Sequence, residues 1–141
     1  MAVKAKILNA SAGSGKTYQL AYNYVRELIK EPAAYRHILA VTFTNKATEE
    51  MKSRILKEIH RLAADYRSSY RKLLMRDLGL TPEEIKKRAT EARSKMLHDY
   101  SRFTVLTIDT FFQRILRAFI KELGLDLNYN IELETASILT K

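Results

Sequence analysis

The segment that most restricts the fold is ILNASAGSGKTYQL, residues 7–20, in which a glycine-containing turn separates an apolar run from an amphipathic one. Residues 3–8 alternate and then become apolar, which is typical of a strand entering a sheet. From Thr17 to Lys30, apolar side chains recur every three or four residues, which predicts a helix with one buried face. A strand joined to a helix by such a short turn favours an α/β fold.

The turn itself has the composition of a phosphate-binding loop. Residues 10–17 read ASAGSGKT, which matches G-x-x-x-x-G-K-[ST] except that alanine stands first. Gly13 and Gly15 would let backbone N–H groups surround phosphate oxygens at a helix amino terminus. Lys16 would reach the β- and γ-phosphates, and the Thr17 hydroxyl would ligate Mg²⁺, which makes these two the catalytic residues. The predicted triphosphate and Mg²⁺ site comprises Ala10, Ser11, Ala12, Gly13, Ser14, Gly15, Lys16 and Thr17.

The rest of the chain continues the alternation of strands and helices. A capping box at Thr81, directly after Gly79, marks a helix start, and Gly124 marks a helix end. The order of elements favours a parallel sheet with right-handed crossovers and flanking helices. We expect strands at residues 36–44 and 102–109 and a short one at 127–133, and helices from 46 toward 74, from 82 to about 100, and from 110 to 123.

Composition bears on the partner and the compartment. Lys and Arg number 25 against 16 Asp and Glu, a net charge of +9, which favours a polyanionic partner but also fits a solvated lysine-rich surface. There is no cysteine, and no run approaches the roughly 18 apolar residues that a membrane span needs. We therefore expect a cytoplasmic protein without a membrane partner.

Polar residues follow the second and third predicted strands. Thr42, Thr44 and Asn45 offer groups for a phosphodiester backbone, Lys46 offers a charge, and Phe43 offers a ring on which a base could stack. Phe43 fits a core position equally well. Because ligands bind beyond the carboxyl ends of parallel strands, residues 43–46 and 107–110 should share one rim with the glycine turn. We interpret Asp109 as a helix cap or a DNA-side residue rather than a Mg²⁺ ligand.

Two longer motifs narrow the class of phosphate-loop protein. LAVTFTNKATEEMKSRI, residues 39–55, resembles motif Ia of superfamily 1 helicases of the UvrD/Rep type, and ASAGSGKT resembles their motif I. TVLTIDTFFQRILRAF, residues 104–119, resembles the next motif in the RecB/AddA branch, the helicase-nucleases of recombinational repair. The resemblance implies a RecA-like P-loop domain that binds ATP and Mg²⁺. It further implies contact of Thr42, Phe43, Thr44, Asn45, Lys46, Asp109 and Thr110 with single-stranded DNA.

The same resemblance implies that the motor is incomplete within residues 1–141. The chain ends before a DExx motif or the later arginine motifs, so we expect the amino-terminal piece of a helicase that does not hydrolyse ATP alone. Partners implied by the family are single-stranded DNA or duplex ends and a further subunit of a helicase-nuclease complex. Any nuclease domain would lie beyond this chain. Residues 62–101 form a predicted helical insertion, basic and tyrosine-containing, that either faces DNA or is a solvated surface. Phe111, Phe112 and Phe119 are expected in the core.

Two other classes of protein remain open. A small P-loop phosphotransferase would share the glycine turn but would need an acceptor site and lid arginines within 141 residues. A non-catalytic nucleic-acid-binding module could retain the loop only as structure, and its DNA binding would not respond to nucleotide.

Overall fold

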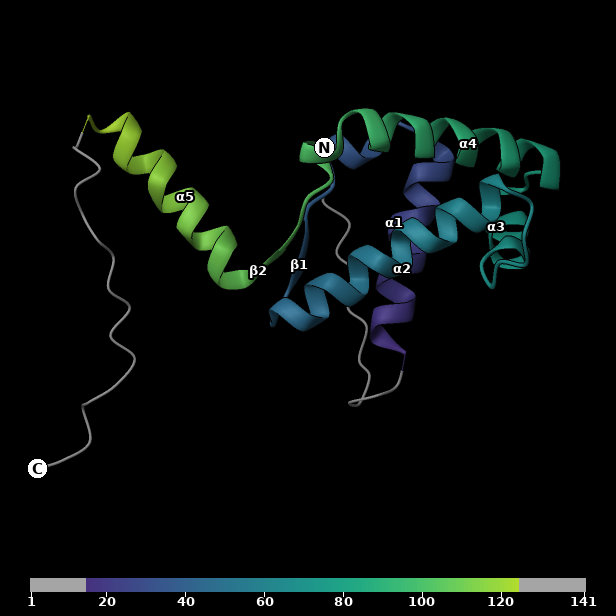
Figure 1. Cartoon of the computed structure of the whole chain (residues 1–141), viewed down its shortest axis with the longest axis horizontal. Helices are drawn as coiled ribbons and strands as arrows, with labels where there is room; N and C mark the ends of the chain where they lie inside the picture. Colours follow the sequence, from purple (N-terminus) through teal and green to yellow (C-terminus); the bar gives the residue numbers. More distant parts are fainter. Residues whose placement is uncertain (1–14, 125–141) are drawn as a thin grey trace, which may run out of the picture. The chain divides into compact units, whose positions relative to one another are not determined.

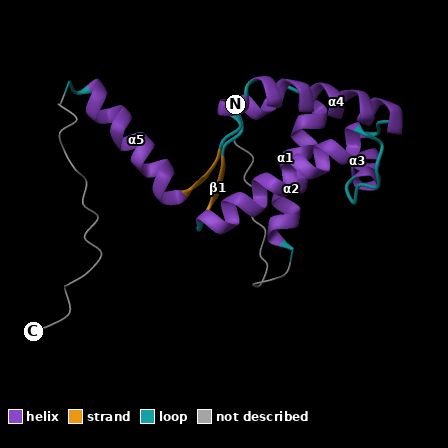
Figure 2. Cartoon of the chain, viewed as in Figure 1, coloured by secondary structure: helices purple, strands orange, loops and turns teal. Residues whose placement is uncertain are grey.

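The computed structural model describes residues 15–124, and the chain divides after Thr107 into two units. The predicted strands at residues 3–8 and 127–133 and the loop residues Ala10, Ser11, Ala12, Gly13 and Ser14 lie outside the described residues. Figure 1 and Figure 2 show the elements of each unit. The first unit contains α1 (Lys16–Lys30), a 3-10 turn (Ala34–Arg36), β1 (Ala40–Thr42), α2 (Asn45–Ala63), α3 (Arg71–Leu78), α4 (Pro82–His98), a second 3-10 turn (Tyr100–Arg102) and β2 (Val105–Thr107); the second contains α5 (Ile108–Glu122).

The two strands pair in parallel, as the order of elements predicts. Ala40 lies opposite Val105 and Thr42 opposite Thr107, so both strands end at the same edge. Each strand is shorter than expected because neighbouring turns and helices claim its ends: a 3-10 turn occupies residues 34–36, Thr44 caps α2, and α5 begins at residue 108. The architecture is α/β, with helices around a two-stranded parallel sheet within the described residues.

Helices α1, α2 and α4 pack against one another and form the core of the first unit. Their amphipathic patterns place aliphatic and small side chains on the facing sides, where burial removes them from water. Phe103 and Val105 extend this core toward the sheet, and the Tyr24 and Phe103 rings meet edge to face at 5.6 Å. The buried residues of the three helices include Ala21, Val25, Leu28 and Ile29 in α1, Met51, Ile55, Ile59 and Leu62 in α2, and Ile85, Ala89, Ala92 and Met96 in α4.

The expectation that the second helix continues toward Leu74 is wrong, because α2 ends at Ala63. Asp65 adopts a left-handed backbone with φ of 61°, a conformation that aspartate tolerates better than most residues. Its carboxylate accepts ion pairs from Arg71 at 2.7 Å and from Lys86 at 3.9 Å. These contacts replace the next helical turn and redirect the chain into α3.

The capping signals at the start of α4 are confirmed. The Thr81 hydroxyl accepts from the Glu84 N–H, and the Glu84 carboxylate accepts from the Thr81 N–H at 2.8 Å. Gly79 ends α3 in the left-handed conformation with φ of 65°. Arg88 of α4 then donates to the Ile29 and Lys30 carbonyls, which ties the insertion to the carboxyl end of α1.

Helix α5 is strongly amphipathic, yet none of its side chains is buried. The prediction that Phe111, Phe112 and Phe119 belong to the core is therefore wrong: Phe111 is half-buried, and the other two are exposed. The pattern identified the helix correctly, but apolar periodicity does not supply the surface that a helical face packs against.

Candidate functional site

The amino terminus of α1 carries the described part of the predicted nucleotide site. Gly15 lies just before the helix with φ of 83°, which a side chain would disfavour, and its carbonyl accepts from the Gln19 N–H at 2.9 Å. Lys16 is exposed and Thr17 half-buried in the first turn, which contains no acidic residue. A helix terminus with this backbone and charge suits an anion.

The turn after β1 presents the predicted DNA-binding residues at the edge where the strands end. Figure 1 shows the amino ends of α1 and α2 on the same side of the first unit, toward which β1 also runs. Phe43 is 85% exposed, so its assignment to the core is wrong. Thr44 caps α2 by accepting from the Ala47 N–H at 3.1 Å, and Asn45 and Lys46 begin the helix with exposed side chains.

Thr48 is a site residue that sequence reasoning missed. Although it is only 6% exposed, its hydroxyl lies 2.5 Å from the Thr42 hydroxyl and donates to the Thr44 carbonyl at 3.1 Å. The Thr42 hydroxyl also lies within hydrogen-bond distance of the Leu106 carbonyl in β2, at 3.4 Å. The available signal was a threonine four residues after the cap, on the apolar side of the helix.

Asp109 and Thr110 belong to the second unit. Both lie in the first turn of α5, with Asp109 exposed and Thr110 half-buried. Asp109 is the second residue of the helix, so its interpretation as the capping residue is wrong. A carboxylate in the first turn instead interacts favourably with the helix dipole.

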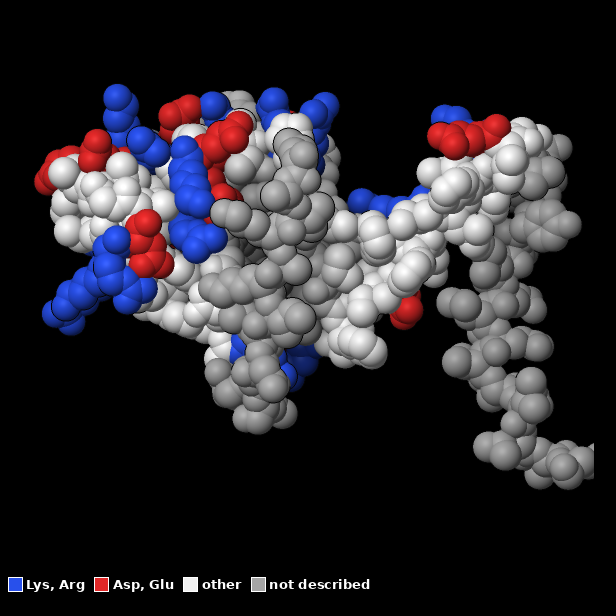
Figure 3. All heavy atoms as spheres, turned by 180° about the vertical axis from the view of Figure 1, so that it is seen from behind, with Lys and Arg blue, Asp and Glu red and all other residues white. Residues whose placement is uncertain are grey.

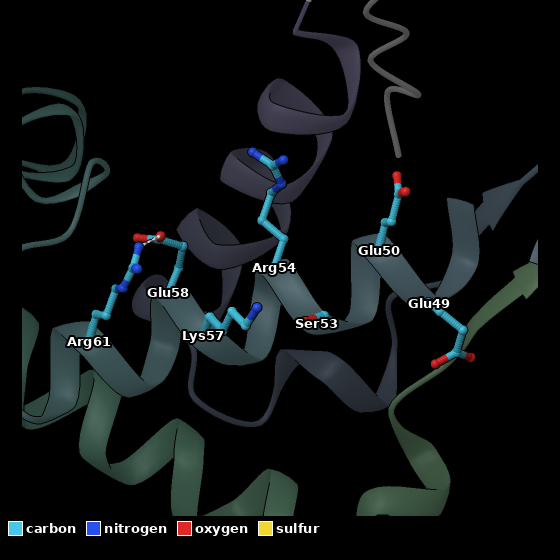
Figure 4. Close-up of a pocket in the computed structure, with 7 residues that line it drawn as sticks. All are labelled: Glu49, Glu50, Ser53, Arg54, Lys57, Glu58 and Arg61. Atoms are coloured by element: carbon cyan, nitrogen blue, oxygen red, sulfur yellow. Dashed lines mark hydrogen bonds and ion pairs between the residues drawn. The ribbon is translucent and has the colours of Figure 1, made fainter. Parts of the chain in front are cut away.

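A hollow of about 540 Å³ follows the outer face of α2. Figure 4 shows that its lining side chains come from successive turns of this one helix, with Glu58 and Arg61 paired at 2.9 Å. Three carboxylates and three cations line it, so opposite charges balance and a polyanion gains little there. The lining residues are Glu49, Glu50, Ser53, Arg54, Lys57, Glu58 and Arg61.

A metal centre built only from protein side chains is not part of the described structure. Within residues 15–124, no group of three or more His, Cys, Asp or Glu side chains is arranged to hold a metal ion. The two strand-end turns and the start of α1 therefore remain the candidate site.

The helical insertion is a mixed-charge surface rather than a continuous basic one. Figure 3 shows acidic and basic side chains side by side over the first unit. Arg76 pairs with Asp77 at 2.7 Å, and Lys95 pairs with Glu91 at 2.7 Å. Tyr70 is fully buried, so it cannot present its ring to a nucleic acid in this structure.

Tyr70 instead connects the insertion to the first turn of α1. Its hydroxyl donates to the Tyr18 carbonyl at 3.0 Å, and the two rings meet at 4.8 Å. Burial raises the pKa of Tyr70 to about 12. Tyr22, which donates to Asp77 at 2.6 Å, extends this cluster to α3. The residue directly after Thr17 is thus held in place by the insertion.

Comparison with known proteins agrees with the motif order. Residues 3–140 match the family model described as UvrD/REP helicase N-terminal domain. The chain belongs to this helicase family. No solved structure gave a significant match. The match covers the glycine turn and both strand-end turns, so the predicted UvrD/Rep-type affiliation is confirmed.

The related helicase sequences come from the predicted branch. The chain is 32% identical over 137 residues to a protein of Clostridium novyi named as a subunit of the ATP-dependent helicase/nuclease, which covers 96% of this chain and 9% of that protein. It is 34% identical over 123 residues to "RecBCD enzyme subunit RecB" of Escherichia coli, covering 79% of this chain and 10% of that protein. The chain thus spans about a tenth of the length of these relatives. Among the described residues, no helix is long and apolar enough to cross a membrane.

Proposed function

We propose that the chain is part of the first motor domain of an ATP-dependent DNA helicase or of a helicase-nuclease complex. The observation that carries the proposal is the family match over residues 3–140, which includes the glycine turn and the segment after β1. The relatives are named as subunits of helicase-nuclease enzymes, which supports DNA and a further protein chain as partners. The full activity, including any exonuclease step in DNA repair or recombination, belongs to the longer protein.

In this proposal, residues 10–17 bind Mg²⁺ and ATP. The backbone from Gly13 to Gly15 surrounds the phosphates, Lys16 neutralises charge on the β- and γ-phosphates, and the Thr17 hydroxyl ligates Mg²⁺. The left-handed Gly15 and the exposed Lys16 at the start of α1 support these roles. Mg²⁺ would bridge phosphate oxygens and reduce the repulsion that an attacking group meets.

Single-stranded DNA would bind at the turn after β1. Phe43 would stack on a base, while Thr42, Thr44, Asn45 and Lys46 would contact the phosphodiester backbone. The exposed ring of Phe43 supports stacking, because a solvated aromatic surface gains from being covered. Asp109 and Thr110 would contribute further contacts from α5.

The test is calorimetric titration of the chain with Mg·ATPγS, with and without a short single-stranded oligonucleotide, at two salt concentrations. Lys16→Ala removes a charge-assisted contact of about 1.5–3 kcal/mol, so nucleotide affinity should fall at least about tenfold. Lys30→Ala, at the other end of α1, is the matched control and should bind nucleotide normally.

Equal nucleotide affinity of the Lys16→Ala variant and the parent chain would refute the nucleotide site. DNA binding that is indifferent to both nucleotide and Lys16→Ala would favour a non-catalytic nucleic-acid module. Steady turnover with a small-molecule acceptor would favour a phosphotransferase.

A further inference from the structure

The three threonines around Phe43 form one hydroxyl network. Thr42 and Thr44 flank Phe43 in sequence, and the Thr48 hydroxyl touches both, at the Thr42 hydroxyl and the Thr44 carbonyl. The Thr42 hydroxyl also lies 3.2 Å from the Thr44 carbonyl. The backbone on both sides of the exposed ring is therefore tied to one buried side chain of α2.

The number of hydroxyl protons decides which parts of this network depend on Thr48. Two hydroxyls supply two protons, and one of them occupies the short Thr42 to Thr48 contact. If the Thr48 hydroxyl were removed, Thr42 could still donate to the Thr44 or Leu106 carbonyl. The Thr44 carbonyl would also keep the Thr48 N–H at 3.0 Å. Loss of the hydroxyl thus leaves no buried group stranded, but it removes the tie that spans Phe43.

We propose that Thr48 is a positioning residue that holds Phe43 in the orientation for stacking on a nucleic-acid base. This inference rests on the proposed DNA contact at the turn after β1. A ring held ready on a fixed turn loses less conformational freedom when it binds, so its affinity is higher than that of the same ring on a loose turn. Thr48 itself, being buried, does not touch the nucleic acid.

The test measures binding of a fluorescently labelled oligothymidylate to the chain by anisotropy, with Thr48→Val as the principal variant. Valine keeps the shape and burial of threonine but lacks the hydroxyl. We expect a loss of affinity of about three- to tenfold, in line with one hydrogen bond. Thr48→Ser restores the hydroxyl and should restore affinity. The salt dependence of binding should not change, because no charge is altered.

A double-mutant cycle with Phe43→Ala separates positioning from general stability. Phe43→Ala should lower affinity at least about fivefold. In the Phe43→Ala background, Thr48→Val should have no further effect, because Thr48 acts only through the ring. Thermal unfolding of each variant provides the structural control, and Thr48→Ala replaces Thr48→Val if the valine variant does not fold.

The outcomes distinguish the inference from the function on which it rests. Unchanged binding by Phe43→Ala would overturn both. Weaker binding by Phe43→Ala together with normal binding by Thr48→Val would overturn only the role of Thr48. The role of Thr48 is likewise overturned if serine fails to rescue, or if Thr48→Val weakens binding equally with and without the Phe43 ring.

Discussion

Helices α2 and α5 follow the two strands of one parallel pair, and both are amphipathic, yet their surroundings differ. The apolar side of α2 is covered by α1 and α4, and Ile55 and Leu62 are fully buried. No side chain of α5 is buried, and Phe112, Leu116 and Phe119 are exposed. The contrast shows that periodicity specifies a helix and its apolar side, whereas stability depends on what packs against that side.

The largest expected difference between the two helices is in amide hydrogen exchange. Amides of α2 should exchange at least about 100-fold more slowly than those of α5, because opening α2 requires separating it from α1 and α4. Peptide-resolved exchange followed by mass spectrometry measures this. Helix α4, which shares the same core, is the control and should behave as α2 does. Equal protection of α5 and α2 would mean that the apolar side of α5 is covered in solution.

Matched leucine truncations make the comparison energetic. Leu62→Ala in α2 should lower the free energy of unfolding by about 2–5 kcal/mol, because it leaves a cavity in a packed interior. Leu116→Ala in α5 should change it by no more than about 0.5 kcal/mol, because this side chain is already exposed. Both substitutions alter helix propensity equally. Urea unfolding followed by circular dichroism decides the matter, and similar losses in both variants would contradict the structure.

A smaller, pH-dependent effect separates buried from exposed tyrosines. An unfolded tyrosine ionises near pH 10, but burial raises the pKa of Tyr70 to about 12. The folded chain therefore keeps a proton that the unfolded chain releases. The contribution of Tyr70 is fully present below about pH 10 and is lost as the pH rises toward 12.

Unfolding curves recorded from pH 9 to 12 test this titration. Tyr70→Phe removes the ionising group, so the free energy of unfolding should fall less steeply with pH than in the parent chain. Tyr66→Phe, at an exposed position, should retain the parental slope. Parallel slopes for Tyr70→Phe and the parent would show that Tyr70 is not buried in solution.

Local sequence signals were sufficient where the interaction itself is local. Thr81 and Glu84 lie three residues apart and satisfy each other, so the start of α4 is legible without the fold. Gly79 and Gly124 mark helix ends for the same reason, because each supplies a left-handed backbone within its own turn. The parallel direction of the strands also followed from the order of elements along the chain.

Signals that depend on distant partners were misread. The end of α2 depends on Asp65 meeting Arg71 and Lys86, which lie on other elements. Phe43 fitted a core strand by composition, but its ring points into solvent because α2 begins directly afterwards. Thr48 carried no signal strong enough to single it out, since its role depends on a strand six residues earlier.

The amino-acid order therefore establishes the helicase family, the helices and their caps, and the residues that a phosphate loop and a DNA-binding turn require. These follow from short-range hydrogen bonds and from periodicity. The packing of α4 on α1 and α2, the exposure of Phe43 and the burial of Thr48 were decided by the tertiary structure. The physical reason is that burial and hydroxyl pairing are properties of neighbours in space, which no single stretch of the chain contains.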